Sequence, residues 1–265
     1  MAQPHTTCAI VTGAGSGIGR ACAVRLARDG APIAVLDRDG AAAAETVARV
    51  EAVGGKGSAF EVDVTDEAGV SDAVDALSAR HGPPGVLVNC AGIAIRKGLF
   101  ETTVTEWKRV IEVNLTGYFV VLKKVAEAMR AQGGAIVQIA SIAGHIGYGY
   151  PSYTAAKGGV LAMTRQLAAE LAPYRIRINS VSPGVVQTGL NSDTLADDLV
   201  RTTTIAAIPC GRLGGSGDIA EAVAFLTGPG AGFITGADLV VDGGMTSRIH
   251  WGAAGERLTH FHEQH

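Results

Sequence analysis

The chain has 265 residues and a formal net charge of −3, with 47 % apolar and 18 % charged residues. This composition supports a full apolar core and shows no basic surface of the kind that binds nucleic acid or membranes. No apolar run approaches the ~20 residues that span a bilayer. The segment from Met1 to Thr7 lacks the charged and apolar regions of a signal peptide.

The cysteines of this chain lack the close pairing that is typical of metal sites, and His260 and His262, two residues apart, do not form a usual helical metal pair, so we assign no metal. Free thiols indicate a reducing compartment, and we expect a cytoplasmic protein. The four cysteines are Cys8, Cys22, Cys90 and Cys210.

Seven short apolar runs alternate with helical patterns along the chain. The expected strands cover residues 7–12, 32–36, 58–62, 85–89, 135–140, 175–181 and 239–241. The first expected helix runs from a glycine loop to about residue 29, and the others cover 40–53, 66–80, 104–130, 152–172 and 218–226. This alternation predicts βαβ units with a parallel sheet. Because the strands are continuously apolar, we expect helices on both faces of the sheet.

The predicted fold class is therefore α/β, a doubly wound Rossmann-type three-layer sandwich around a seven-stranded parallel sheet. We expect one domain over residues 1–245. A tail, 246–265, follows it and holds four of the chain's seven histidines. For this tail we weigh disorder against packing of Arg248, His250 and Trp251 on a neighbouring subunit.

The first strand leads into a glycine-rich loop, residues 12–19 (TGAGSGIG), and then into a helix. Such a loop predicts a cradle for a dinucleotide pyrophosphate, because glycines allow close backbone approach and the helix N-terminus supplies N–H donors. Asp37 ends the second strand, where a carboxylate suits a ribose diol and repels a 2′-phosphate of about −1.5 to −2 charges. Arg38 could hold that phosphate, so the pair favours NAD without excluding NADP. The alternative is a surface Asp-Arg-Asp turn.

Tyr153 and Lys157 lie four residues apart in an expected helix, so their side chains share one face. A free tyrosine has a pKa of about 10, and a fixed ammonium beside it makes the phenolate accessible nearer neutral pH. Taken alone, the pair fits an ordinary amphipathic helix, Ser141 fits a strand-end turn and Asn114 fits a polar helix face. Together with the glycine loop they indicate an active site.

These motifs occur in the order typical of the short-chain dehydrogenase/reductase family, which the chain resembles over residues 7–244. One departure is Cys90, where the family usually has a second asparagine. The residues that carry the resemblance are Thr12, Gly13, Gly17, Ile18, Gly19, Asn89, Ala91, Gly92, Asn114, Ser141, Tyr153, Lys157, Pro183, Gly184, Thr188, Asp242, Gly243 and Gly244.

The resemblance implies a role for each catalytic residue. Tyr153 is expected to act as the general acid and base. Lys157 is expected to hold the nicotinamide ribose and to lower the pKa of Tyr153. Ser141 is expected to donate a hydrogen bond to the substrate oxygen, and Asn114 to position a water that links Lys157 to solvent.

The resemblance also implies a set of cofactor-binding residues and a homotetramer. Within the set, Asp63 and Val64 are expected at the adenine, and Val186 and Thr188 at the nicotinamide carboxamide. The main dimer face is expected on the helices 104–130 and 152–172. The cofactor set comprises Gly13, Ser16, Gly17, Ile18, Gly19, Asp37, Arg38, Asp63, Val64, Asn89, Ala91, Gly92, Tyr153, Lys157, Pro183, Gly184, Val186 and Thr188.

The residues that would contact a substrate are less clearly marked. Arg96 and Lys97 could attract an acidic substrate, although a solvated or subunit-facing loop is the simpler interpretation. Residues 190–210 are expected to form a mobile lid. The candidates for substrate contact are Ser141, His145, Tyr150, Tyr153 and Leu190, of which His145 and Tyr150 could instead cover a loop.

The sequence thus predicts an NAD-dependent oxidoreductase that interconverts a small-molecule secondary alcohol and a ketone, with Tyr153 as general acid and base. One alternative is a reductase of 3-oxoacyl thioesters, against which Asp37 argues because reductive biosynthesis in the resembled family generally uses NADP. A second alternative, from another class, is a catalytically silent cofactor-binding regulator or scaffold.

Overall fold

A single parallel sheet of seven strands forms the centre of the computed structural model, which describes residues 7–247. The strand order is β3-β2-β1-β4-β5-β6-β7, and every neighbouring pair is parallel. This confirms the predicted doubly wound fold. The strands are β1 Ala9–Thr12, β2 Ile33–Asp37, β3 Gly57–Glu61, β4 Val86–Asn89, β5 Gly134–Ile139, β6 Ile176–Pro183 and β7 Asp238–Val241.

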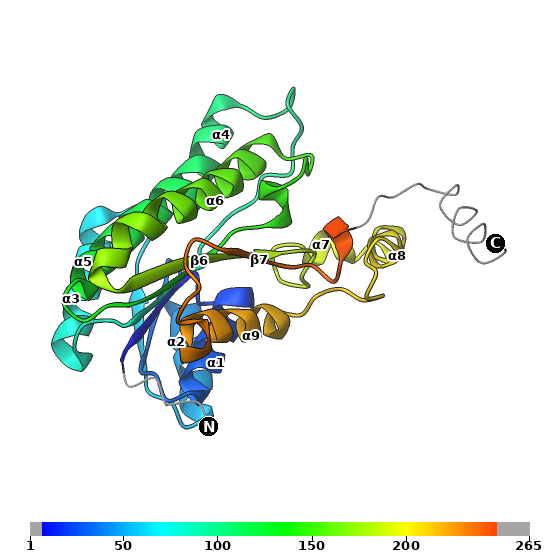
Figure 1. Cartoon of the computed structure of the whole chain (residues 1–265). Coiled ribbons are helices and arrows are strands. Elements are labelled where there is room, and N and C mark those ends of the chain that lie inside the picture. Colours follow the sequence, from blue (N-terminus) through cyan, green and yellow to red (C-terminus); the bar gives the residue numbers. More distant parts are fainter. Residues whose placement is uncertain (1–6, 248–265) are drawn as a thin grey trace, which may run out of the picture.

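Helices cover both faces of the sheet (Figure 1). On one face α1 packs against α9 and α2, and on the other α3 packs against α5 and α4 against α6. The helices are α1 Gly17–Arg28, α2 Gly40–Ala52, α3 Glu67–His81, α4 Val104–Ile111, α5 Gly117–Met129, α6 Pro151–Leu171, α7 Ser192–Leu195, α8 Asp198–Ala206 and α9 Ser216–Thr227. The short helices α7 and α8 lie in segment 189–210, where the sequence shows only weak helical signals.

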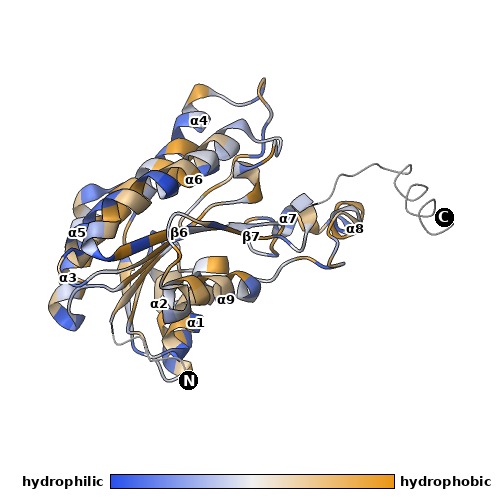
Figure 2. Ribbon diagram, viewed as in Figure 1, coloured by the Kyte–Doolittle hydropathy of each residue, from blue (hydrophilic) through white to orange (hydrophobic). Residues whose placement is uncertain are grey.

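Burial explains the sequence pattern of the strands. Every residue of β1 and β4 is buried, as expected for central strands with helices on both sides. The edge strand β3 is only partly buried, and the opposite edge strand β7 exposes Leu239 and Val240. Figure 2 shows apolar residues along the central strands and mixed polarity on the surrounding helices.

The predicted helix 104–130 is interrupted. A π-helical turn, Glu112–Thr116, separates α4 from α5. Asn114 lies in this turn and is fully buried, and its side-chain amide bonds the backbone of Ile93 twice. A π-helical turn widens the helix by one residue and is often found at functional sites.

Within residues 7–247, no helix is long and apolar enough to cross a membrane. The hypothesis on Arg248, His250 and Trp251 concerns residues outside the described part of the chain.

Candidate active site

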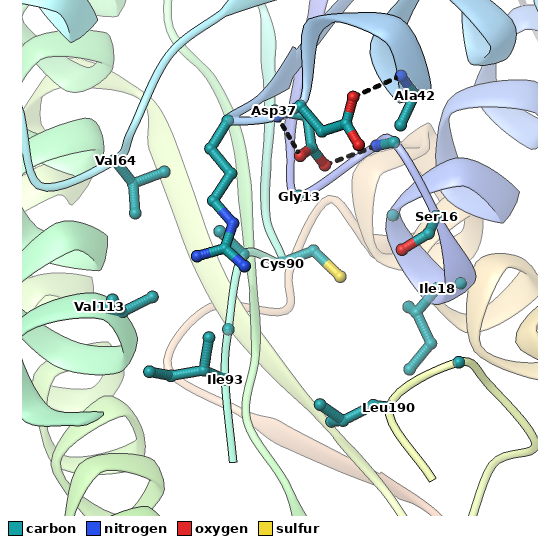
Figure 3. Close-up of a pocket in the computed structure, with 18 of the residues that line it drawn as sticks. Gly13, Ser16, Ile18, Asp37, Ala42, Val64, Cys90, Ile93, Val113 and Leu190 are labelled. Atoms are coloured by element: carbon teal, nitrogen blue, oxygen red, sulfur yellow. Dashed lines mark hydrogen bonds between the residues drawn. The ribbon is translucent and has the colours of Figure 1, made fainter. Parts of the chain in front are cut away.

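A cavity of about 430 Å³ opens at the carboxyl ends of β1, β2 and β4 (Figure 3). The chain runs from β1 to β2 on one side and, after β3, reaches β4 on the other side, so the strand order reverses here. Such a switch point is the usual ligand crevice of a doubly wound sheet. Most of the predicted cofactor residues line this cavity: Gly13, Ser16, Gly17, Ile18, Gly19, Asp37, Arg38, Asp63, Val64, Ala91, Gly92 and Thr188.

The glycine loop forms one wall of the cavity, and its backbone conformation requires glycine at two positions. Gly13 and Gly17 have φ of 62° and 51°, which residues with a side chain rarely adopt. A Cβ on Gly13 would lie 2.6 Å from the Ala91 Cα. Helix α1 begins at Gly17 with no acidic side chain in its first turn. Free N–H groups at a positive helix end suit a pyrophosphate, so these residues fit a dinucleotide.

Asp37 points from the end of β2 toward the glycine loop (Figure 3). Its Oδ2 accepts a hydrogen bond of 2.8 Å from the Gly15 N–H, and its Oδ1 accepts one of 3.0 Å from the Asp39 N–H. Arg38 is exposed and lines the same cavity. The cavity therefore presents both a carboxylate and a cation where the ribose of a dinucleotide is expected.

The far side of the cavity carries Asp63, Val64 and a residue that the sequence motifs do not indicate, Arg109. The Asp63 carboxylate accepts a hydrogen bond from the Thr65 N–H at 3.0 Å and another from the Thr65 hydroxyl at 2.7 Å. These bonds, with Arg109 3.5 Å away, hold the pKa of Asp63 below its usual value despite partial burial. Arg109 reaches the cavity from α4, and no spacing rule of a dinucleotide site predicts a residue there.

Asn89 lines neither this cavity nor the second cavity that adjoins it. It is fully buried, with its Oδ1 accepting from the Thr12 hydroxyl at 3.0 Å and its Nδ2 donating to the Tyr118 carbonyl at 2.9 Å. The Thr12 hydroxyl in turn accepts from the N–H groups of Cys90 and Ala91. Asn89 thus holds the turn that follows β4 rather than facing a ligand.

A second cavity, of about 380 Å³, adjoins the first. The two share Ile18, Cys90, Gly92, Thr188 and Leu190 in their walls. Several residues predicted for catalysis, cofactor binding or substrate contact line the second cavity: Ser141, Tyr150, Tyr153, Lys157, Pro183, Gly184, Val186 and Leu190. A ligand in the first cavity therefore lies next to a ligand in the second, beside these shared residues.

His145 lies apart from this group. Its Nε2 is 2.9 Å from the Asp238 Oδ2 and 3.1 Å from the Ser182 hydroxyl, and it does not line the second cavity. Its contacts connect the loop after Ser141 to β6 and β7. Tyr148, which the sequence places beside it, lines the cavity and packs edge-to-face on Tyr150 with ring centroids 5.7 Å apart.

Helix α6 carries Tyr153 and Lys157 on one face, as their spacing predicts. Lys157 is buried, and its Nζ donates to the Ile139 carbonyl at 2.7 Å and to the Tyr118 hydroxyl at 3.1 Å. That Nζ lies 4.6 Å from the centroid of the Tyr118 ring and 5.8 Å from that of Tyr153. Tyr118 is a further residue that the motifs do not indicate. Its position four residues after Asn114, on the same helix face, is the only sequence signal.

The buried setting separates the two titrating groups. Burial raises the pKa of Tyr153 to about 12, with the Ser141 hydroxyl acting in the opposite direction. Burial lowers the pKa of Lys157 to about 8. The Lys157 ammonium donates its hydrogen bonds to Ile139 and Tyr118, so in this arrangement burial has the largest effect on the Tyr153 pKa.

Comparisons with known proteins agree with this geometry. A family model described as "Enoyl-(Acyl carrier protein) reductase" matches residues 13–246. A (3R)-3-hydroxyacyl-CoA dehydrogenase of Canis lupus familiaris is 41 % identical over 259 residues, covering 92 % of this chain and 99 % of the relative. A cis-4-hydroxycyclohexanecarboxylate dehydrogenase of Sinomonas cyclohexanicum is 45 % identical over 243 residues, covering 90 % and 96 %.

The solved structures show the same likeness. A candidate 2-deoxy-D-gluconate 3-dehydrogenase from Agrobacterium tumefaciens, solved with NADP bound, superimposes with a TM-score of 0.84 at 37 % identity, covering 91 % of this chain and 97 % of that one. Both curated relatives are named as dehydrogenases of hydroxylated compounds. The chain belongs to the short-chain dehydrogenase/reductase family.

Proposed function

We propose that this oxidoreductase interconverts a secondary alcohol and a ketone with NAD, with Tyr153 as general acid and base. The observation that carries the proposal is that the two cavities share lining residues. This places a dinucleotide cradle next to a buried tyrosine, a serine and a lysine. The bound nicotinamide supplies the hydride acceptor or donor, and the residues of the chain supply orientation and the proton.

The four predicted catalytic residues take different parts in this proposal. Ser141 donates a hydrogen bond to the substrate oxygen, and Tyr153 takes the hydroxyl proton during oxidation and returns it during reduction. Lys157 holds the ribose and supports the phenolate. Asn114 acts from the π-helical turn, where its amide keeps Ile93 and the adjoining loop in place at the cavity edge.

For the cofactor, Asp37 supports NAD, because its carboxylate occupies the end of β2 beside the glycine loop and disfavours a 2′-phosphate. Arg38 and the NADP of a solved relative argue for the other cofactor. The substitution Asp37→Ser removes the carboxylate while Arg38 remains. We expect it to reduce the ratio of NAD to NADP efficiency at least 10-fold, since each 1.4 kcal/mol corresponds to a factor of 10.

An absorbance screen of secondary alcohols and ketones, with NAD(H) and NADP(H) in parallel, tests the proposed activity. We expect reversible reduction of the cofactor with at least one class of alcohol and a preference for NAD. Absence of turnover across the panel, together with tight NADH binding, would favour the scaffold alternative instead.

The second candidate activity is on 3-hydroxyacyl or 3-oxoacyl thioesters, because the relative at 41 % identity is named as a hydroxyacyl-CoA dehydrogenase. Including 3-hydroxybutyryl-CoA and its 3-oxo counterpart in the screen separates the two candidates. A large preference for the thioester over free alcohols would select this second activity.

We further propose a cytoplasmic homotetramer with a C-terminal tail after the domain 1–245. All four cysteines are unpaired, which suits a reducing compartment. Large apolar side chains are exposed near α4 and α5 and again near α9 and β7, as expected of subunit contacts. They are Leu99, Phe100, Val104, Trp107 and Phe119 in the first group and Phe225, Phe233, Leu239 and Val240 in the second. Light scattering after size exclusion tests the assembly, and a monomer contradicts it.

A further inference from the structure

Arg96 lines the second cavity, whereas its neighbour Lys97 does not. The Lys97 Nζ lies 2.5 Å from the Glu106 Oε1, so this lysine is paired with a carboxylate of α4. Arg96 forms no ion pair with any carboxylate of residues 7–247. The two adjacent cations, which the sequence alone does not separate, therefore have different surroundings.

Arg96 lies at the rim of the cavity. Its side chain is exposed, and its Nη2 donates to the carbonyl of Leu190, in the segment that follows Thr188. A guanidinium has five N–H donors, and this bond uses one of them. The remaining donors can bind a planar carboxylate in the paired geometry for which arginine is suited.

The lining of this cavity is positive. Its charged side chains are Arg96 and Lys157, and no Asp or Glu is among the lining residues of the described chain. The positive charge of Arg96 makes a small contribution that lowers the pKa of Tyr148 and of Tyr153, in each case against the larger effect of burial. A cavity with this charge favours an anionic ligand over a neutral one of the same shape.

The lining of this cavity combines polar and apolar side chains. Tyr153, Ser141 and Lys157 lie at the catalytic end, and Arg96 lies at the rim. Apolar side chains line the space as well: Ala94, Ile142, Val185, Leu195 and Val200. This arrangement suits a molecule with a hydroxyl at one end, a compact apolar body and an anionic group at the other.

We propose that Arg96 is a specificity-determining residue that binds the carboxylate of a hydroxy acid, with a compact or cyclic hydrocarbon body, as the oxidation substrate of this enzyme. The proposal rests on the proposed alcohol dehydrogenase activity and names its substrate class. The carboxylate stays unchanged in the reaction. Its contact with Arg96 sets the distance at which the hydroxyl carbon meets the catalytic residues.

The first test measures binding without turnover. Titration calorimetry on the NADH-saturated protein compares cyclohexanecarboxylate with cyclohexanecarboxamide, which has the same shape and no charge. We expect the parent to prefer the carboxylate. Arg96→Met, which keeps chain length and removes charge, should weaken carboxylate binding roughly 10-fold to 100-fold, as for a lost hydrogen bond to a charged group. The matched control Lys97→Met should stay within about 2-fold of the parent, because Lys97 faces Glu106.

The second test measures turnover of cis-4-hydroxycyclohexanecarboxylate and of its amide. Arg96→Met should lower kcat/KM for the acid mainly through KM, and the acid-to-amide ratio should fall by the same factor as in the binding test. Arg96→Lys should restore part of the ratio, since the charge returns without the paired geometry.

Three outcomes would overturn the assignment: equal losses for acid and amide in Arg96→Met, an effect of Lys97→Met as large as that of Arg96→Met, or a parent that prefers 3-hydroxybutyryl-CoA to every hydroxy acid. Loss of the proposed activity is distinguishable from these. A parent that binds the carboxylate through Arg96 but turns over no alcohol refutes the dehydrogenase proposal and leaves the anion site intact.

Discussion

At the scale of single residues, the arrangement around Lys157 is the feature that bears most directly on catalysis. Two acceptors, the Ile139 carbonyl and the Tyr118 hydroxyl, hold a buried ammonium whose pKa is about 8. Tyr118 also donates to the Ile139 carbonyl at 3.0 Å, so its oxygen is fixed on two sides. Each acceptor stabilises the charged lysine against the effect of burial.

The substitution Tyr118→Phe removes one acceptor and keeps the packing of the ring. The pKa of Lys157 should fall further, because the ammonium loses a hydrogen bond while the neutral amine does not depend on it. With less ammonium to support the Tyr153 phenolate, alcohol oxidation should need a higher pH. We expect the acidic limb of the kcat/KM profile to move up by roughly 0.5 to 1 pH unit.

The control for this prediction is Tyr174→Phe, which removes a surface hydroxyl that accepts a hydrogen bond from Arg130, its one side-chain partner within residues 7–247. Its pH profile should match that of the parent. A Tyr118→Phe profile that also matches the parent would contradict the positioning role, even if the variant lost stability.

At the scale of elements, the π-helical turn between α4 and α5 is the part of the site that sequence periodicity did not predict. Apolar spacing indicates one helix over 104–130, because a π-helical turn adds a single residue and barely disturbs the pattern. The structure shows the turn at Glu112–Thr116, where Asn114 bonds the backbone of Ile93 in the loop after β4. The glycine loop and the Tyr153–Lys157 pair were predictable because spacing within a short segment determines their geometry, and Asp37 was predictable because it ends the strand that follows the loop and its helix.

Other site residues could not be predicted, because tertiary packing determines where they lie. Arg109, Tyr118 and the separation of Arg96 from Lys97 depend on how α4, α5 and the loop after β4 pack together. His145 lies near Ser141 in sequence, yet its imidazole is held by Ser182 of β6 and Asp238 of β7. Tertiary contacts of this kind leave no periodic or motif signal along the chain.

The element-scale prediction concerns Asn114→Ala. The variant leaves the Ile93 N–H and carbonyl without partners inside the protein, which should destabilise it by roughly 1–3 kcal/mol. The loop beside the cavity should also loosen, so activity should fall more than stability explains. Thr103→Ala is the control, because it removes the capping box of α4, at about 1 kcal/mol, away from the cavities. Denaturant unfolding and kcat/KM measure both effects, and equal activity in the two variants would contradict the prediction.

At the scale of the whole molecule, surface carboxylates connect neighbouring elements and make the stability of the fold depend on pH. Hydrogen bonds from Lys97 and Thr103 lower the pKa of Glu106 to about 2, and those from Arg212 and Gly215 lower the pKa of Asp218 to about 2. Their ordinary values are 4.5 and 3.8. A depressed carboxyl pKa contributes stability that is present above the ordinary pKa and is lost as the pH falls toward the folded value.

The melting temperature should therefore decline between about pH 4.5 and pH 2, the window set by these values. The double variant Glu106→Gln, Asp218→Asn should decline less steeply over this range, because two groups no longer titrate. Both sites are on the surface, so added salt should reduce the difference. Parallel melting curves with unchanged slopes in both proteins would contradict this account.

The central claim is that Tyr153 transfers the proton in a reaction between an alcohol and a bound nicotinamide. Its most direct test is the single-turnover rate of NAD reduction in the parent and in Tyr153→Phe, with NADH affinity measured alongside. The account predicts a rate loss of roughly 100-fold to 10,000-fold, the range for a lost general acid or base, with NADH affinity within about 3-fold of the parent. A Tyr153→Phe variant that reduces NAD at the parent rate would contradict it.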